Sequence, residues 1–208
     1  MLLISACSQK KVFDSTYYCQ RLKLSCTRDN QIVFFATSKG NFEVELFGED
    51  NPVTVSNFIE NVKKNIYKDK KFYKIINYPQ LKVIHSGVYQ ESNYFQEKNQ
   101  FSNKISPSIP LEIKLKKVVE PKYKYQIKNP IEILNVKNLF EMGSIAMVKR
   151  GDKESSSTEF FLVTNKIPEL DGRYSIFGRI VKGFEVLEKI DKKDYIYEIK
   201  VSVSELNS

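Results

Sequence analysis

The sequence of 208 residues contains one histidine, His85, and three cysteines, Cys7, Cys19 and Cys26. The spacing of the cysteines matches no zinc-binding pattern, so we expect no metal site built from cysteine or histidine. Cys19 and Cys26 either pair as a disulfide in an oxidising compartment or remain two free thiols. The chain also lacks a run of about 18 consecutive apolar residues, which argues against a transmembrane helix.

The composition excludes a disordered or fibrous chain, because 41% of the residues are hydrophobic and 28% are charged. The formal net charge is +8, and the basic residues are mostly lysines that are spread along the chain. Solvated faces and loops explain such lysines, and no nucleic-acid motif accompanies them. We therefore expect no specific nucleic-acid partner.

The first residues resemble the end of a bacterial lipoprotein signal, because Leu3-Ile4-Ser5-Ala6 precedes Cys7. This resemblance implies a lipid on Cys7, a tether over residues 8–30 and a location in the cell envelope or periplasm. The segment departs from the pattern, since it has no basic start and its apolar run is short. Either the true start codon lies upstream, or the cysteine is accidental and the protein is cytoplasmic.

Period-2 patterns dominate the rest of the chain, which we expect to form one domain over residues 31–204. Residues 32–37 and 42–47 predict a hairpin around Gly40. Residues 51–66 change to a helical period, with Asn51 as the N-cap and Pro52 at the first helical position.

Further short strands and a second helix follow this predicted helix. The stretch from 89 to 140 is polar and proline-containing, and it predicts a divergent insertion of long loops with one strand at 111–114. About eight strands, two helices and no βαβ rhythm indicate a mainly β fold, a closed antiparallel barrel with two capping helices. The other predicted elements are strands at 71–76, 81–85, 144–149, 159–164, 174–180 and 196–203, and a helix at 184–190.

Four blocks in order resemble the cyclophilins, a family of peptidyl-prolyl cis/trans isomerases. Phe-Tyr-Lys-Ile-Ile at 72–76 is similar to the family's Phe-His-Arg-Val-Ile strand, and Leu-Asp-Gly-Arg-Tyr at 170–174 matches another signature. The remaining blocks are residues 37–46 with 52–58, and residues 143–147 with 157–162. The resemblance implies an eight-stranded cyclophilin barrel that needs no cofactor and binds X-Pro segments of other proteins, as a monomer.

The resemblance also implies the site residues. Lys74 stands in the place of the catalytic arginine, His85 in that of a glutamine, and Tyr174 where many members have histidine. Phe161 matches the aromatic floor of the proline pocket. The other implied substrate-binding residues are Val83, Val148, Leu170 and Met147.

The chain departs from the family at several of these positions. Lysine lacks the planar fork of arginine, Glu169 stands where an aromatic residue is common, and residues 77–82 include about three additional residues. We expect a folding-assisting isomerase of reduced activity. The alternatives are a weak or inactive module that binds proline-containing partners, and a basic adaptor for a polyanion.

Overall fold

The predicted hairpin at the start of the domain is present. β1 (Gln31–Thr37) and β2 (Gly40–Leu46) pair antiparallel in the computed structural model, which describes residues 14–88 and 108–202. Phe35 lies opposite Phe42, and their rings stack at 4.6 Å between centroids. Because alternate side chains point to the same side of a strand, both rings enter the main core.

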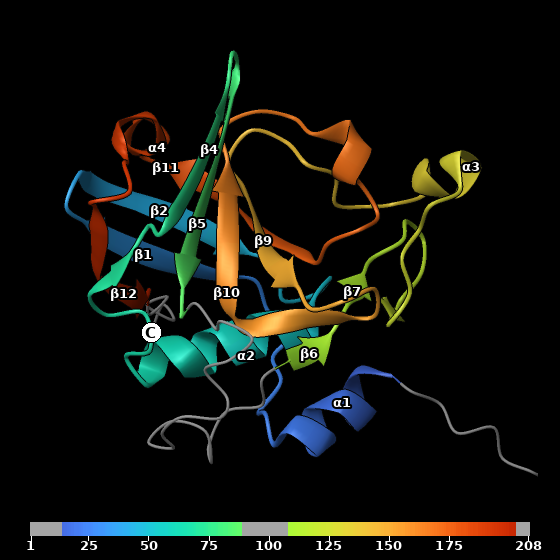
Figure 1. Cartoon of the computed structure of the whole chain (residues 1–208). Helices are drawn as coiled ribbons and strands as arrows, with labels where there is room; N and C mark the ends of the chain where they lie inside the picture. The colour runs from blue at the N-terminus through green and yellow to red at the C-terminus, as the bar shows by residue number, and fades with distance from the viewer. Residues whose placement is uncertain (1–13, 89–107, 203–208) are drawn as a thin grey trace, which may run out of the picture.

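The described residues contain twelve strands, and ten of them form one curved antiparallel sheet (Figure 1). The strand order is β3-β12-β1-β2-β11-β9-β10-β5-β4, with β6 paired to β10, while β7 and β8 form a separate ladder. The remaining strands are β3 (Lys70–Lys71), β4 (Lys74–Tyr78), β5 (Leu81–Gly87), β6 (Ser108–Pro110), β7 (Glu112–Ile113), β8 (Lys122–Tyr123), β9 (Ser144–Lys149), β10 (Glu154–Val163), β11 (Ile176–Lys182) and β12 (Tyr195–Val201).

β3, at one end of the sheet, lies close to β5, the next-to-last strand at the other end. The hydroxyl of Ser86 on β5 donates a hydrogen bond to the carbonyl of Lys71 on β3, at 3.2 Å. The mainly β prediction is confirmed, but the prediction of eight strands was too low. The run at 71–76 divides into β3 and β4, and strands of two or three residues are too short to show a period in the sequence.

Helices α2 (Pro52–Lys63) and α4 (Glu185–Lys189) are the two that the sequence predicts, and they lie at opposite ends of the curved sheet (Figure 1). Pro52 opens α2 as expected. Asn51 is the N-cap residue as predicted, but its side chain makes no capping hydrogen bond and instead donates to the carbonyl of Glu112. The Glu112 carboxylate caps α2, where it accepts the N–H groups of Val53 and Thr54.

The described part of the predicted tether is folded. Helix α1 (Ser15–Leu22) begins after Asp14, whose side chain accepts the N–H of Tyr17. A disulfide joins Cys19 to Cys26, so the paired alternative for these cysteines is confirmed. Tyr18 and Cys19 pack against Val53 of α2, which docks this arm on the domain. Cys7 lies outside the described residues.

The predicted insertion is also largely folded where the structure describes it, from residue 108 onward. Five buried apolar residues form a small core of their own there, and helix α3 (Pro130–Ile133) lies beside it. The lysines between these residues hid the pattern, since Lys114 is itself buried and donates to the carbonyl of Val119 at 2.6 Å. The core residues are Leu111, Ile113, Leu115, Ile127 and Val136.

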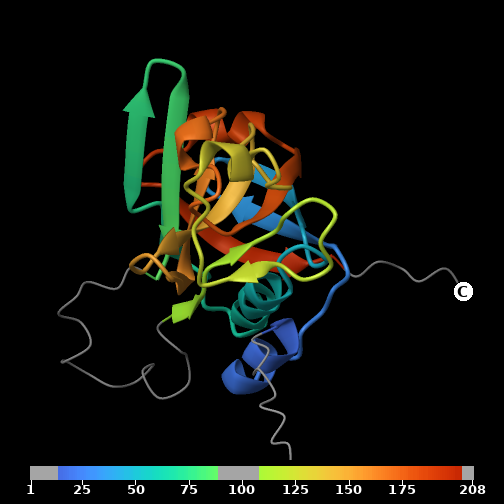
Figure 2. The ribbon, with the colours of Figure 1, turned by 90° about the vertical axis from the view of Figure 1, so that its right-hand side faces the viewer.

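The hairpin of β4 and β5 projects beyond the body of the domain (Figure 2). Asn77 pairs with Lys82 and Tyr78 with Leu81, so the additional residues lengthen the ladder and do not interrupt it. No helix among the described residues is both long enough and apolar enough to cross a membrane.

Candidate active site

One row of paired residues crosses five strands of the sheet. Lys74 on β4 lies opposite His85 on β5, His85 opposite Phe161 on β10, Phe161 opposite Ala146 on β9, and Ala146 opposite Ile176 on β11. Directly paired residues point to the same side of a sheet, so the five side chains share one face. The neighbouring residues on these strands point into the main core.

Four predicted substrate-binding residues gather on this outer face. Val83 and Phe161 belong to one apolar cluster, against which Val148, Leu170 and Tyr174 pack. The cluster also contains Phe140, which the sequence reading missed because it ends the polar stretch at 89–140. Registered strands therefore bring together residues that are far apart in the sequence.

Aromatic rings form the centre of the cluster. The ring of Phe161 stacks with His85 at 5.3 Å and with Phe140 at 5.7 Å, and Tyr174 meets it edge-on at 5.3 Å. Only 3% of Phe161 is exposed, whereas Leu170 and Tyr174 are half-buried. A ligand ring can reach Phe161 only after one of these partly exposed side chains turns aside.

Met147 does not belong to this face, so its assignment as a substrate-binding residue is wrong. It pairs with Phe160, is fully buried and contacts the main core. Adjacent residues in a strand point to opposite sides, so Met147 and Val148 cannot line the same pocket. Ala146 is the β9 residue that shares the face with Phe161.

Lys74 lies at the open end of the row. Its side chain is exposed, and within the described ranges no hydrogen bond or ion pair involves its ammonium group. This lysine can therefore present its N–H groups to a ligand on the outer face. Glu169 is also exposed and adds no aromatic wall to the pocket.

A buried carboxylate on β10 is already paired with an arginine. Glu159 is 3% exposed and accepts hydrogen bonds from Arg150 at 2.5 Å and from the hydroxyl of Tyr73 at 3.0 Å. Sequence reasoning missed this pair, because Arg150 lies in the turn after β9 and meets Glu159 only when β10 folds back along β9. Because Glu159 already binds Arg150 and Tyr73, it does not form an ion pair with Lys74.

His85 is held neutral. Burial, together with the charge of Lys74, lowers its pKa from 6.5 to about 4. A neutral imidazole packs against Phe161 without bringing a second positive charge beside Lys74. Among the described residues, no three His, Cys, Asp or Glu side chains converge as metal ligands.

Comparison with known proteins identifies the class. The solved structure of a cyclophilin type peptidyl-prolyl cis-trans isomerase from Cryptosporidium parvum superposes with a TM-score of 0.58 at 20% identity, covering 85% of this chain and 99% of that one. A second structure from that organism, determined in the presence of the dipeptide Ala-Pro, gives 0.57 at 21% identity and covers 84% of this chain and all of that one. The fold is that of the cyclophilins.

The sequence comparisons identify the family. Residues 32–205 match the family model described as cyclophilin type peptidyl-prolyl cis-trans isomerase/CLD. A Helicobacter pylori peptidyl-prolyl cis-trans isomerase is 28% identical over 170 residues, which cover 81% of this chain and 85% of that protein. Peptidyl-prolyl cis-trans isomerase A of Dickeya dadantii is 28% identical over 165 residues, 77% of this chain and 70% of that protein. The chain belongs to this family and is a peptidyl-prolyl cis-trans isomerase.

Proposed function

We propose that isomerisation takes place on the outer face of the sheet. The substrate proline ring lies over Phe161, and the X-Pro amide bond lies beside Lys74. The observation that carries this proposal is the registered row in which the unpaired ammonium group of Lys74 and the apolar cluster around Phe161 share one side of the sheet. Val83, Val148 and Leu170 form the walls that hold the proline ring.

The chemistry requires no nucleophile or cofactor. Rotation about a peptide bond has a barrier of about 18–20 kcal/mol, because the C–N bond has partial double-bond character. Twisting removes the resonance and returns the lone pair to the prolyl nitrogen. A positively charged donor near that nitrogen stabilises the twisted amide more than either planar form, and it thereby lowers the barrier. Lys74 supplies this donor.

Two features of the site support a reduced rate. Lysine offers one ammonium group, so it cannot hold the twisted amide through two parallel N–H groups as a guanidinium can. Phe161 is also covered, and substrate binding must first displace Tyr174 or Leu170. Tyr174 stabilises the covered state through its edge contact with Phe161 and through Lys149, which lies 5.7 Å above its ring.

Exchange spectroscopy by NMR on a peptide with one Ala-Pro bond tests this assignment. Wild-type protein accelerates cis–trans exchange, and Lys74→Ala lowers kcat/KM while the affinity for the peptide is retained. Loss of affinity without loss of rate per bound substrate would place Lys74 outside the chemical step. An unaccelerated wild type would leave a proline-binding module, the alternative function.

We also propose that the protein acts as a monomer tethered in the cell envelope through a lipid on Cys7. The disulfide between Cys19 and Cys26 supports an oxidising compartment, since such bonds are rare where thiols are kept reduced. Membrane fractionation of wild type and of Cys7→Ala tests the tether. Equal recovery of both in the soluble fraction would favour the cytoplasmic alternative.

A further inference from the structure

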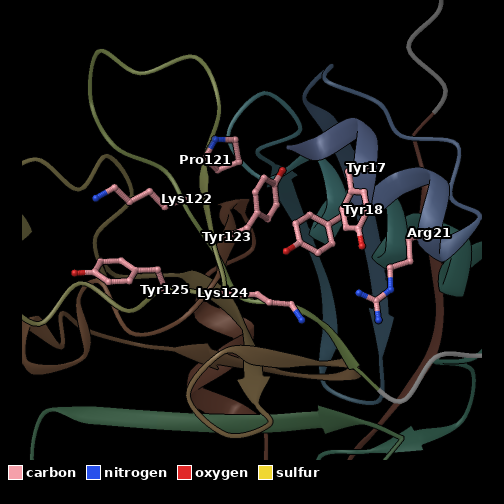
Figure 3. Close-up of a pocket in the computed structure, with 8 residues that line it drawn as sticks. All are labelled: Tyr17, Tyr18, Arg21, Pro121, Lys122, Tyr123, Lys124 and Tyr125. Carbon is pink, nitrogen blue, oxygen red and sulfur yellow. The ribbon is translucent and has the colours of Figure 1, made fainter. Parts of the chain in front are cut away.

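A second groove lies between helix α1 and strand β8, away from the row of Lys74 and Phe161 (Figure 3). Its volume is about 740 Å³. None of its lining residues comes from the strands that carry the isomerase site. The lining residues are Tyr17, Tyr18, Arg21, Pro121, Lys122, Tyr123, Lys124 and Tyr125.

Tyrosine rings form the apolar part of this groove. Tyr18 contacts Tyr123 at 4.8 Å between ring centroids and meets Tyr17 edge-on at 5.1 Å. Tyr125 is half exposed, and the ammonium group of Lys122 lies 5.1 Å from its ring. Aromatic side chains that line a groove bind the apolar pyrrolidine rings of extended proline-containing peptides.

The groove is positively charged. Arg21, Lys122 and Lys124 line it, and none of the lining residues in the described part of the chain is acidic. Lys122 and Lys124 are each balanced by one glutamate, at 2.6 Å in both pairs. The guanidinium of Arg21 has no hydrogen-bond or ion-pair partner within residues 14–88 and 108–202, and Figure 3 shows it on the same side of the tyrosine rings as Lys124. This excess charge favours an acidic ligand.

Both walls of the groove are fixed in place. On the α1 side, the Cys19–Cys26 disulfide closes the helix end, and Arg28 joins the start of α1 through the hydroxyl of Ser15. On the β8 side, the hydroxyl of Tyr123 donates to the buried carboxylate of Glu112 at 2.8 Å. A groove that is ordered before binding loses little conformational entropy when it binds a ligand.

We propose that this groove is a second, non-catalytic binding site for acidic, proline-bearing peptide segments in an extended polyproline conformation. Proline rings pack on the partly exposed rings of Tyr17 and Tyr125, and a glutamate or aspartate side chain pairs with Arg21. An extended peptide accounts for a groove lined by four tyrosines better than a compact anion, which would need only converging charges. A client bound here presents its other proline bonds to the isomerase site at a high effective concentration.

Fluorescence anisotropy with a short labelled peptide of alternating glutamate and proline tests the proposal on the full chain. We expect salt-sensitive binding that Tyr125→Ser weakens about fivefold or more and that Arg21→Gln weakens about two- to fivefold. Lys189→Gln is the matched control, because Lys189, like Arg21, is an exposed cation in the last turn of a short helix. That control leaves the affinity unchanged.

Three comparisons would overturn the proposal. A lysine–proline peptide that binds equally well would remove the role of charge, and a glutamate–glycine peptide that binds equally well would remove the role of the rings. Anionic vesicles that bind through Arg21 while the peptide does not would make the groove a membrane contact. Phe161→Leu separates the two sites, because it leaves peptide affinity at the groove unchanged even if the isomerase assignment fails.

Discussion

Lys74 and His85 face each other as a registered pair on the β4–β5 hairpin, and the imidazole remains neutral beside the exposed ammonium group. This arrangement leaves one positive charge at the end of the row that leads to Phe161. Under the proposed function, the pair gives a chain that lacks the family's arginine and glutamine at these positions a charged donor beside the apolar cluster around Phe161.

Restoring the guanidinium should increase catalysis. Lys74→Arg raises kcat/KM for an Ala-Pro peptide several-fold, because two N–H groups can hold the twisted amide. Lys74→Ala lowers kcat/KM about tenfold or more. Lys63→Arg on the exposed side of α2 is the control for any general effect of replacing a lysine by an arginine. A decrease in rate for Lys74→Arg would show that this side chain does not reach the prolyl amide.

His85 should give the stability a dependence on acid pH. Its pKa in the folded state is about 4, below the usual 6.5, so the unfolded chain binds a proton more readily. The stabilising contribution is complete above pH 6.5 and is lost as the pH falls from 6.5 through 4. Urea titrations between these pH values measure the slope, which is smaller in His85→Gln. Equal slopes would mean that His85 titrates normally.

Glu112 should act in the opposite direction. Burial raises the pKa of this helix-capping carboxyl from 4.5 to about 7. The folded state therefore holds the proton more tightly than the unfolded chain, and its contribution is complete below pH 4.5 and is lost as the pH rises through 7. Glu112→Gln removes this loss, so the difference in unfolding free energy between wild type and variant changes from pH 5 to pH 7.5.

Glu60→Gln is the control for that experiment, because Glu60 lies on α2, the helix that Glu112 caps, and is partly exposed beside Lys63 and Lys64. This substitution leaves the pH slope of the wild type unchanged. A Glu112→Gln variant with the slope of the wild type would show that the four donors around the carboxylate hold it charged at neutral pH.

Two adjacent phenylalanines separate function from packing. Phe161→Leu lowers kcat/KM about tenfold or more, since the pocket loses its aromatic floor. Phe160→Leu changes the main core and lowers the free energy of unfolding by about 1 kcal/mol or more, while the folded fraction keeps its kcat/KM. Circular dichroism and NMR exchange on both variants measure these effects. Similar losses of kcat/KM in both variants would contradict the assignment of Phe161 to the active site and of Phe160 to the main core.

The disulfide should stabilise the N-terminal arm and not the sheet. Reduction, or Cys26→Ser, increases hydrogen exchange in α1 (Ser15–Leu22) and leaves isomerase activity unchanged, because Tyr18 and Cys19 contact α2 and not the outer face. Cys7→Ser serves as the cysteine control. Increased exchange in β1 and β2 would show that the arm supports the whole domain.

The sequence could predict elements with a strong local period. Residues 144–149 were predicted as a strand with the bounds that β9 has, and the helix stripe from Val55 to Val62 is buried as expected. Helix α1 could not be predicted in this way, because its order depends on a disulfide and on contacts with distant residues such as Val53 and Glu120. Such long-range contacts leave no local pattern.

The alternation of side chains along a strand was enough to predict part of the site from the sequence. Val148 was placed in the pocket, and alternation then requires Ala146 and excludes Met147, which the motif alone had suggested. The Arg150–Glu159 pair and the stacking of Phe140 on Phe161 required the register between strands. Residue types suggested the chemistry, but pairing decided which side chains meet.

The row that takes one residue from each of five strands also restricts how this protein can diverge. A single insertion within any of those strands would exchange its outer residues for core residues, so activity and folding would be lost together. Additional residues are accommodated at a hairpin tip, where those of the β4–β5 hairpin lengthen the ladder in pairs and leave the register of the row unchanged. Descendants of this chain can therefore change the pocket by substitution, while changes of length accumulate at the hairpin ends.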